Sequence, residues 1–420
     1  MGCFSRGEQQ SQSLKEREKL HYGWIIVATG TAVLFACLGL GRFSLGMLLP
    51  SMGLSLDLNY SQMGLIGTGN FAGYMGSIVV AGFLAKAIGA RWTVCIGLVL
   101  VGASMILISR AAGHMEVMML YVATGIGSGL ANIPMMGLVS HWFAKSNRGK
   151  AAGMITSGNG IAIVCTGLLI PWVNSSMGAE GWRSGWLIIG ITSLVVAAVA
   201  ANFLRNDPAE KGIAPLGEVH EVTSVSRRPV LDIQETGPWT MVHLGFVYAF
   251  FGASYAVYVT FIVVDLVGER GFGENAAGFF WAVVGGLSIL SGPVYGLLSD
   301  RLGRKFAMML AYAMFAISYA LAAMDLPTPF LYASIAIFGL TVWSVPTIMS
   351  AAVGDYAGPL RAAKALGFIT LFFGFGQIVG PYVAGLTADT SGSFRIAFWL
   401  CAILSLTAMF LSYFLRSASR

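Results

Sequence analysis

Long apolar runs alternate with short polar segments along most of the chain. A helix needs about 20 mainly apolar residues to cross a bilayer. Runs of this kind predict helices near residues 24–49, 61–85, 92–109, 116–140, 151–173, 184–204, 239–266, 276–298, 304–323, 329–353, 364–387 and 395–415. The pattern therefore predicts an all-α membrane protein with twelve transmembrane helices.

One long polar segment, residues 205–238, separates six predicted helices from the other six. We expect it to be the boundary between two six-helix bundles. The predicted organisation is an N-terminal tail over 1–22, a bundle over 23–204, a linker over 205–238, a bundle over 239–416 and a C-terminal tail over 417–420.

Composition agrees with a bilayer protein, because 56% of the residues are hydrophobic and only 10% are charged. The 54 glycines suit closely packed membrane helices. Four of the five cysteines lie in apolar runs and Cys3 lies in the polar tail, without CxxC or metal spacing. We therefore expect unpaired cysteines, no metal and no cofactor.

Basic residues predict the orientation. With both termini in the cytoplasm, most Lys and Arg residues fall in cytoplasmic segments, and the four on the outside are Arg110, Arg183, Arg270 and Arg395. The net charge of +6 is then a topology signal, and we expect no nucleic-acid partner.

The two halves repeat at a constant offset of 214 residues. The offset pairs Gly82-Phe-Leu-Ala-Lys86-Ala-Ile-Gly89-Ala-Arg91 with Gly296-Leu-Leu-Ser-Asp300-Arg301-Leu-Gly303-Arg304-Lys305, Lys150-Ala-Ala-Gly153 with Lys364-Ala-Leu-Gly367, and Gly125 with Gly339. Such matches across separate helices predict an internal duplication.

The second-half segment Gly296-x-x-x-Asp300-Arg301-x-Gly303-Arg304-Lys305 resembles the signature loop of the major facilitator superfamily. The resemblance implies the major facilitator fold, with two pseudo-symmetric six-helix bundles that alternate in access. We expect Asp300 near the start of the eleventh helix, close to Arg361 or Lys364. The alternative is an ordinary positively charged cytoplasmic loop.

The first-half copy of this loop departs from the family pattern. Lys86 stands where the family usually has an acid, close to the basic start of the fifth helix. We therefore expect a weaker cytoplasmic gate in the first half. The predicted gating residues are Gly82, Lys86, Gly89, Arg91, Gly296, Asp300, Arg301, Gly303, Arg304 and Arg361.

Three segments resemble organic-anion carriers such as monocarboxylate transporters and oxalate/formate antiporters: Tyr22-Gly23-Trp24, Trp142-Phe143-x-Lys145-x-x-Arg148-Gly149, and Arg205-x-Asp207-Pro208-x-x-Lys211-Gly212. A different set, Gly41-Arg42-Phe43 with Asn70-x-x-Gly73-Tyr74, is similar to a poorly characterised bacterial branch of the superfamily. The eighth predicted helix lacks the arginine of monocarboxylate and oxalate carriers, which argues against their mechanism. Tyr121 and the position of Gly376-x-x-x-Gly380-Pro381 argue against drug/proton antiporters.

Arg42 is the strongest candidate for a substrate contact. It lies inside the apolar run of the first helix, where an unpaired charge is costly. Its guanidinium matches the geometry of a carboxylate or phosphate. Snorkelling of the side chain to the outer interface is the alternative.

Polar and aromatic residues inside other predicted helices complete the candidate site. Asn70 and Tyr74 are four residues apart and share a helix face, and the other candidates are Asn132, Asn159, Tyr255, Tyr258 and Gln377. For the amides the alternative is an interhelical hydrogen bond. For the tyrosines it is a packing stripe.

Few titratable groups are available for ion coupling. Asp265 could carry a proton, although we favour an interfacial carboxylate near the mouth. His141 and Asp355 occupy equivalent repeat positions, and we favour markers of headgroup depth over gate residues.

The sequence lacks a phosphate-binding loop and a nucleophile–base pair, so an enzyme is not expected. We predict a monomeric secondary transporter that moves a small organic anion, such as a carboxylate, across the bacterial cytoplasmic membrane among its lipids. Proton symport is expected only by family analogy. The alternatives are an exporter of hydrophobic or amphipathic compounds and a receptor or scaffold without transport.

Overall fold

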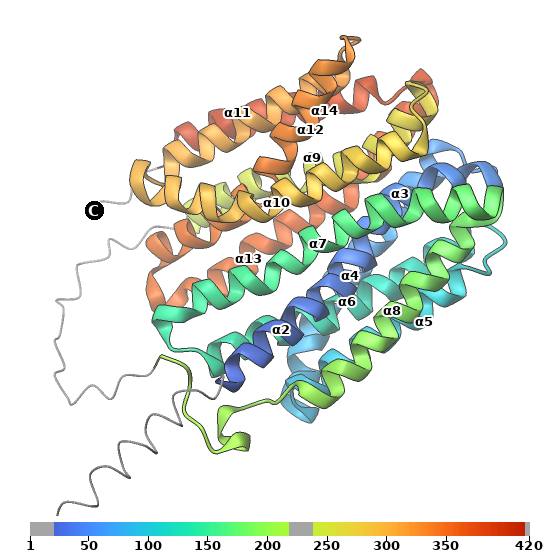
Figure 1. The fold of residues 1–420 in the computed structure, drawn as a ribbon. Helices are drawn as coiled ribbons and strands as arrows, with labels where there is room; N and C mark the ends of the chain where they lie inside the picture. Colours follow the sequence, from blue (N-terminus) through green and yellow to red (C-terminus); the bar gives the residue numbers. More distant parts are fainter. Residues whose placement is uncertain (1–20, 218–237, 416–420) are drawn as a thin grey trace, which may run out of the picture.

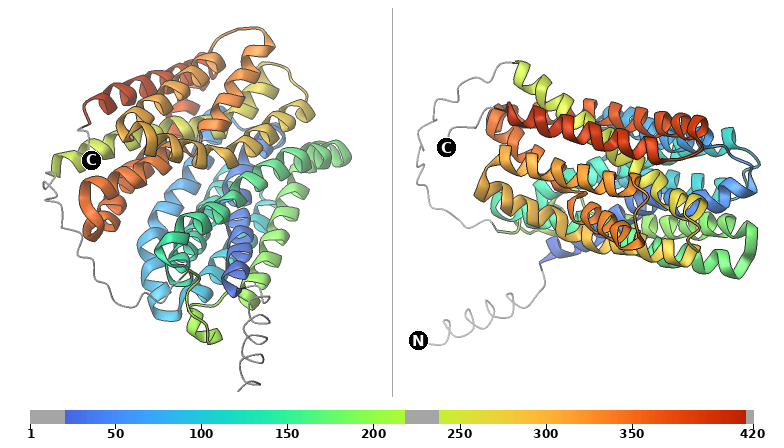
Figure 2. Two further views of the ribbon diagram at one scale, coloured as in Figure 1. Left: turned by 60° about the vertical axis from the view of Figure 1, so that its left-hand side comes forward. Right: turned by 90° about the horizontal axis from the view of Figure 1, so that it is seen from above.

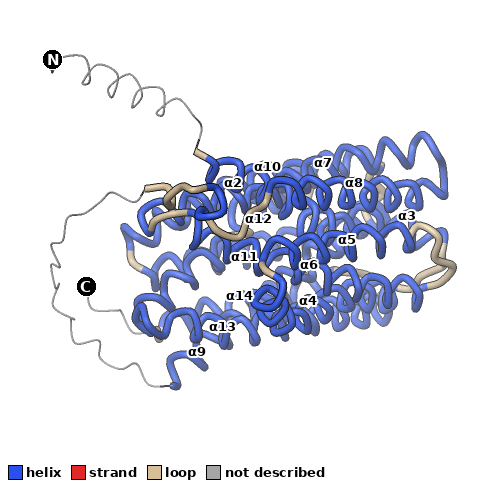
Figure 3. Tube along the Cα trace, turned by 90° about the horizontal axis from the view of Figure 1, so that it is seen from below, coloured by secondary structure: helices blue, strands red, loops and turns tan. Residues whose placement is uncertain are grey.

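The computed structural model describes residues 21–217 and 238–415, which are almost entirely helical (Figures 1 and 3). The helical elements are α2 (Tyr22–Leu34), η1 (Phe35–Leu40), α3 (Gly41–Ser55), α4 (Tyr60–Ile88), α5 (Ala90–Ile108), α6 (His114–Trp142), α7 (Lys145–Met177), η2 (Gly178–Glu180), α8 (Gly181–Phe203), η3 (Pro208–Lys211), α9 (Pro238–Val264), η4 (Asp265–Glu269), α10 (Glu274–Leu302), α11 (Arg304–Ala323), α12 (Thr328–Thr341), α13 (Ser344–Ser391) and α14 (Arg395–Tyr413).

Within the described residues, 12 helices are long and apolar enough to cross a membrane. They confirm the predicted twelve-helix membrane fold. The first span, Tyr22–Ser55, combines α2, η1 and α3, and the kink at Gly358 divides α13 between the tenth and eleventh spans. Residues 1–20 of the predicted N-terminal tail, residues 218–237 of the predicted linker and the whole predicted C-terminal tail lie outside the described residues.

The helices form two bundles that lie side by side (Figures 1 and 2). The first contains α2 to α8, and the second contains α9 to α14. Among the described residues, the bundles meet mainly through α4 with α13, α7 with α10, and α3 with α9. The start of the predicted linker stays with the first bundle, where the Leu216 amide donates to the Trp142 carbonyl at 2.9 Å.

The 214-residue repeat of the sequence also appears in the structure, in the residues at which equivalent helices begin and end. Adding 214 to the bounds of α4 gives those of α10, and the same shift takes the start of α8 to the start of α14. The glycines that follow α4 and α10, Gly89 and Gly303, have φ values of +87° and +89°. Glycine reaches this region with little strain, which explains the same residue at both sharp turns.

Two spans break this symmetry near the middle of the molecule. η1 is a π-helical turn that ends directly before Gly41 and Arg42. In the tenth span the helix is interrupted at Val342 and Trp343, because Pro346 lacks the N–H that would bond to the Val342 carbonyl. The equivalent stretches of α9 and α6 are regular helix.

The bundles approach most closely at one end. We call the end at which the chain enters Tyr22 and Pro238 the terminal side, and the opposite end the far side. A Cβ atom on Gly64 would lie 2.3 Å from the Pro381 carbonyl oxygen, and one on Gly385 would lie 2.4 Å from the Tyr60 carbonyl oxygen. The backbones of α4 and α13 are therefore in direct contact at the far side.

The same two helices are open towards the terminal side. A Cβ atom on Gly82 of α4, or on Gly367 of α13, would meet no heavy atom within 4 Å. Phe83, next to Gly82 on α4, is exposed. The structure is therefore closed between α4 and α13 at the far side and open between them at the terminal side.

Candidate functional site

Arg42 points from the start of α3 towards α4. Its Nε atom donates to Oδ1 of Asn70 at 3.4 Å, and its guanidinium carbon lies 4.8 Å and 4.6 Å from the ring centroids of Phe71 and Tyr74. The residue is half-buried, and its Nη2 atom is buried without a hydrogen-bond partner. Arg42 therefore lies in the interior between helices, a position that differs from snorkelling to the outer interface.

Among the described residues, no carboxylate forms an ion pair with Arg42. Aromatic faces attract its charge instead, and such contacts contribute about 1–2 kcal/mol when desolvated. An intramembrane charge with this incomplete set of partners is suited to binding an anion.

Polar groups of neighbouring helices fix the backbone around Arg42. The hydroxyl of Tyr121 on α6 donates to the Arg42 carbonyl at 3.0 Å. Nδ2 of Asn70, whose side chain is 1% exposed, lies 3.4 Å from the carbonyl oxygens of both Gly41 and Tyr121. Asn132 donates to the Tyr74 hydroxyl at 2.8 Å. The structure thus brings Arg42, Asn70, Tyr74 and Asn132 into one connected network.

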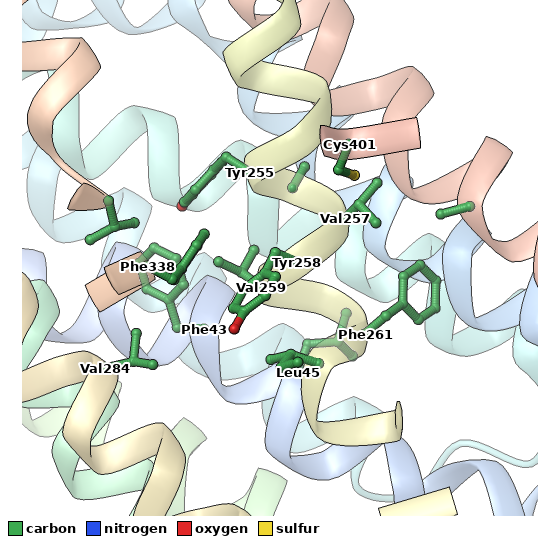
Figure 4. Packing of buried hydrophobic residues seen from close by; sticks show 14 of the residues in the cluster. Phe43, Leu45, Tyr255, Val257, Tyr258, Val259, Phe261, Val284, Phe338 and Cys401 are labelled. Atoms are coloured by element: carbon green, nitrogen blue, oxygen red, sulfur yellow. The ribbon is translucent and has the colours of Figure 1, made fainter. Parts of the chain in front are cut away.

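The second bundle adds aromatic rings to this network. The ring of Phe43 packs against those of Tyr255 and Trp343, with centroid distances of 6.5 Å and 6.0 Å. The ring centroids of Tyr255 and Trp343 are 6.2 Å apart. Figure 4 shows Phe43 with Tyr255 and Val259 of α9. Tyr255 therefore belongs to the same region as Arg42.

A small cavity lies beside the guanidinium. It is lined by Arg42, Leu45, Gly46, Gly67, Asn70, Phe71, Tyr121, Val259 and Thr260, and its volume is about 10 Å³. One water molecule needs about this much space. A solute larger than water would therefore require the surrounding helices to separate.

Three predicted substrate residues lie elsewhere or lack contacts to this network. Tyr258 is buried in the second bundle, where its hydroxyl is 3.0 Å from Ser334 Oγ and its ring stacks on Phe338 at 4.1 Å. Asn159 and Gln377 are buried, and each has one amide atom, Oδ1 and Nε2 respectively, without a partner. Tyr258 has the contacts of a packing residue.

Sequence reasoning missed Phe71, Tyr121 and Trp343 as neighbours of the site. Phe71 and Trp343 lie among many apolar residues, and periodicity gives no sign of which bundle they meet. Pro346, three residues after Trp343, is a signal that could have located the interrupted helix.

The terminal-side loop after α10 contains a compact ion-pair group. Arg304 bonds to Asp300 at 2.5 Å, to Asp355 at 2.7 Å and to Ser299 Oγ at 2.9 Å. Asp300 pairs with Arg304, one helical turn away, and its expected closeness to Arg361 or Lys364 stays a prediction. Asp355, for which a gate residue and a marker of headgroup depth were both considered, joins α13 to this loop.

The corresponding loop after α4 is held by other contacts. The side chain of Arg91 donates to the Ala201 carbonyl, and its backbone N–H donates to Asn206 Oδ1 at 2.9 Å. Lys86, Arg301 and Arg361 are exposed, and Gly82 and Gly296 lie on the helices that precede the two loops. The two halves therefore fasten their terminal-side loops differently.

Asp265 differs from the interfacial carboxylate that the sequence suggested. Its side chain is 1% exposed and pairs with Arg270 at 2.7 Å. Arg270 also donates to the Ala322 carbonyl, so the pair ties η4, which follows α9, to α11. His141 lies 3.8 Å from Asp207, which belongs to the start of the linker.

A family model described as "Uncharacterised MFS-type transporter YbfB" matches residues 34–413. The chain belongs to this family of the major facilitator superfamily. It is therefore a multi-pass membrane transporter, and it is not an enzyme. Membership agrees with the resemblance to a poorly characterised branch that Gly41-Arg42-Phe43 suggested.

Several named transporters are similar to this family member. It is 23% identical to the probable sulfoacetate transporter SauU of Cupriavidus necator, over 86% of this chain and 87% of that protein. It is 22% identical to the hexuronate transporter of Bacillus subtilis, over 88% and 89%. It is 24% identical to human monocarboxylate transporter 11, over 93% and 82%.

Solved structures have the same fold. A bacterial homolog of the human lysosomal transporter Spinster, in an inward-facing and occupied conformation, matches with a TM-score of 0.75 at 13% identity, covering 94% of this chain and 97% of that one. The nucleoside transporter NupG matches with a TM-score of 0.71 at 15% identity, covering 94% and 98%. At these identities the likeness concerns the fold.

Proposed function

We propose that this transporter moves a small organic anion, such as a carboxylate, across the bacterial cytoplasmic membrane by alternating access. The observation that carries the proposal is the guanidinium of Arg42, which lies inside the first span without a carboxylate partner among the described residues. A bound anion would neutralise this charge and bond to the buried Nη2 atom.

Three similar proteins support an acidic solute. Their names give sulfoacetate, hexuronate and monocarboxylate as substrates, and all three are organic anions at neutral pH. The shared feature is a carboxylate group. We therefore assign the carboxylate of the solute to Arg42.

The remaining contacts of the solute would come from both bundles. Asn70 and Asn132 supply polar groups from the first bundle, where the Tyr74 ring holds Arg42, and Tyr255 supplies a ring and a hydroxyl from the second bundle. The partnerless amide atoms of Asn159 and Gln377 are further candidates when the bundles move. Tyr258 is left out of the proposed contacts because Ser334 and Phe338 occupy its hydroxyl and ring.

Alternating access fits the contacts between α4 and α13. They touch at the far side near Gly64 and are separate at the terminal side near Gly82. The basic loops at the terminal side favour a cytoplasmic location for that side. In this orientation the structure corresponds to a cytoplasm-open state of a monomeric carrier, and rocking of the bundles would expose Arg42 to the other side.

Proton symport is the finer part of the proposal and rests on family analogy. Asp265 is a poor candidate for the coupling residue because it is paired with Arg270 within the second bundle.

A thermal-shift screen of the purified transporter tests this function. Carboxylates, sulfonates, phosphates and neutral solutes of similar size would be compared on the wild type and on Arg42→Gln. We expect at least one carboxylate to raise the melting temperature of the wild type and to lose this effect in Arg42→Gln. Stabilisation only by lipophilic neutral compounds, unchanged in Arg42→Gln, would support an exporter of hydrophobic compounds instead.

A further inference from the structure

The interruption of the tenth span places the Trp343 side chain at the boundary between the bundles. At Trp343 the backbone N–H leaves the helical pattern and donates to Ser291 Oγ on α10 at 3.0 Å. The Trp343 carbonyl starts the next helix by accepting from Thr347 Oγ1 at 2.8 Å and from the Thr347 N–H at 3.3 Å. A discontinuous helix within a transporter span is a common site of substrate contact.

Trp343 approaches the Arg42 region through two neighbours. Its ring centroid lies 6.0 Å from that of Phe43, the residue that follows Arg42, and 6.2 Å from that of Tyr255, which also packs against Phe43. Trp343 is half-buried, so part of its surface remains open. A positive charge and an aromatic surface thus come from opposite bundles and meet around Phe43 and Tyr255.

The internal repeat points to the same two positions. With the 214-residue offset, Arg42 corresponds to Ala256 and Trp343 corresponds to Gly129. In each pair, a large side chain in one half corresponds to a small residue in the other half. Arg42 follows the π-helical turn η1 closely, and Trp343 is part of the interruption of the tenth span. Their counterparts lie in the regular helices α9 and α6. The two halves have therefore diverged where charge and aromatic surface meet.

We propose that Arg42 and Trp343 form a two-part site for an organic anion with a flat apolar body, such as an aromatic carboxylate. This inference rests on the proposed function, because it takes Arg42 as the partner of the carboxylate. The body of the anion packs on Trp343 and Tyr255 when the bundles separate, since the present cavity of about 10 Å³ holds no more than water. Short anions engage only Arg42.

The test compares dissociation constants of acetate, benzoate and benzyl alcohol for the purified full chain. We expect benzoate to bind about tenfold more tightly than acetate, since burial of an aromatic ring against aromatic side chains contributes about that factor. Benzyl alcohol, which has the ring without the charge, binds more weakly than benzoate. In Trp343→Ala the benzoate preference falls to about twofold while acetate binding stays unchanged.

Two further variants keep the test decisive. Trp343→Leu retains apolar volume without the ring and should also lose the preference, which covers the case in which Trp343→Ala does not fold. Trp172→Ala removes an exposed tryptophan of α7 and should change neither constant. Equal binding of acetate and benzoate by the wild type would overturn the inference.

The outcomes separate this inference from the proposed function. If Arg42→Gln abolishes binding of both anions but Trp343 variants keep the full benzoate preference, the two-part site is wrong and the proposed function stands. If each anion binds to Arg42→Gln as tightly as it binds to the wild type, the role of Arg42 is wrong, and both proposals fail.

Discussion

The guanidinium carbon of Arg42 lies 4.6 Å from the centre of the Tyr74 ring, and the hydroxyl of that tyrosine accepts a hydrogen bond from Asn132. Arg42 of the first span thus contacts the face of the Tyr74 ring in the second span, and Asn132 of the fourth span fixes the position of that ring. A ring attracts the charge without neutralising it. Arg42 consequently remains able to bind an anion.

Tyr74 variants test this arrangement. Tyr74→Phe keeps the ring beneath Arg42 and leaves only Asn132 without its acceptor, so we expect a loss of about 1 kcal/mol in unfolding free energy and nearly unchanged anion affinity. Tyr74→Leu removes the ring as well and should disorder Arg42. Calorimetric unfolding and anion titration of both variants measure these effects, and equal anion affinity of Tyr74→Leu and the wild type would contradict the arrangement.

Arg304 is expected to stabilise the terminal end of the second bundle. Its side chain holds Asp300, Ser299 and Asp355 together, and Arg304→Gln should cost about 2 kcal/mol in stability. Lys305→Gln is the matched control, because it removes the neighbouring positive charge and leaves the ion pairs of Arg304 in place. The Lys305 ammonium lies 4.2 Å from the centroid of the Tyr413 ring. Thermal unfolding of both variants at low and high salt measures the difference. Equal melting temperatures would contradict a structural role for the Arg304 group.

Asp389 should help to keep the far side closed. Its carboxylate on α13 accepts from the backbone N–H groups of Tyr60 and Ser61 at 2.8 and 2.9 Å, where α4 begins. A negative charge at a helix start is stabilising by about 0.3–1 kcal/mol. We expect Asp389→Asn to increase far-side labelling of a cysteine placed at position 68, in a background without native cysteines. Asp57→Asn, on the exposed far-side turn, is the control that should leave labelling unchanged.

Gly64 should be essential for the same closure, for steric reasons. A methyl group there would lie 2.3 Å from the Pro381 carbonyl oxygen, whereas a methyl group on Gly82 of the same helix would meet no heavy atom within 4 Å. Gly64→Ala should therefore shift the population towards a far-side-open state, detected as faster labelling at position 68. Gly82→Ala should not. Identical labelling in the two variants would show that α4 and α13 do not form the far-side contact.

The sequence predicted the fold well because its signals are local. Each span is an apolar run long enough to be recognised alone, and the 214-residue repeat reappears in the bounds of α4 and α10 and in the φ values of Gly89 and Gly303. The helix face shared by Asn70 and Tyr74 also follows from their spacing of four residues. Such features need no knowledge of how the bundles pack.

The missing parts of the site depend on contacts between distant segments. Tyr255 and Tyr258 have similar sequence surroundings, yet one packs on Phe43 and the other on Phe338. Trp343 becomes a neighbour of Phe43 only because the tenth span is interrupted and the two bundles meet. Asp265 was misjudged because burial beside Arg270 depends on the turn after α9.

The central claim is that Arg42 binds the transported anion, and flux through proteoliposomes measures it most directly. Vesicles preloaded with the carboxylate that stabilises the wild type most would be diluted into its radiolabelled form, and exchange would be followed for the wild type, Arg42→Lys and Arg42→Gln at equal protein content. We predict rapid exchange by the wild type, a reduced rate for Arg42→Lys, which keeps the charge without the planar fork, and background exchange for Arg42→Gln. Exchange by Arg42→Gln at the wild-type rate would contradict the account.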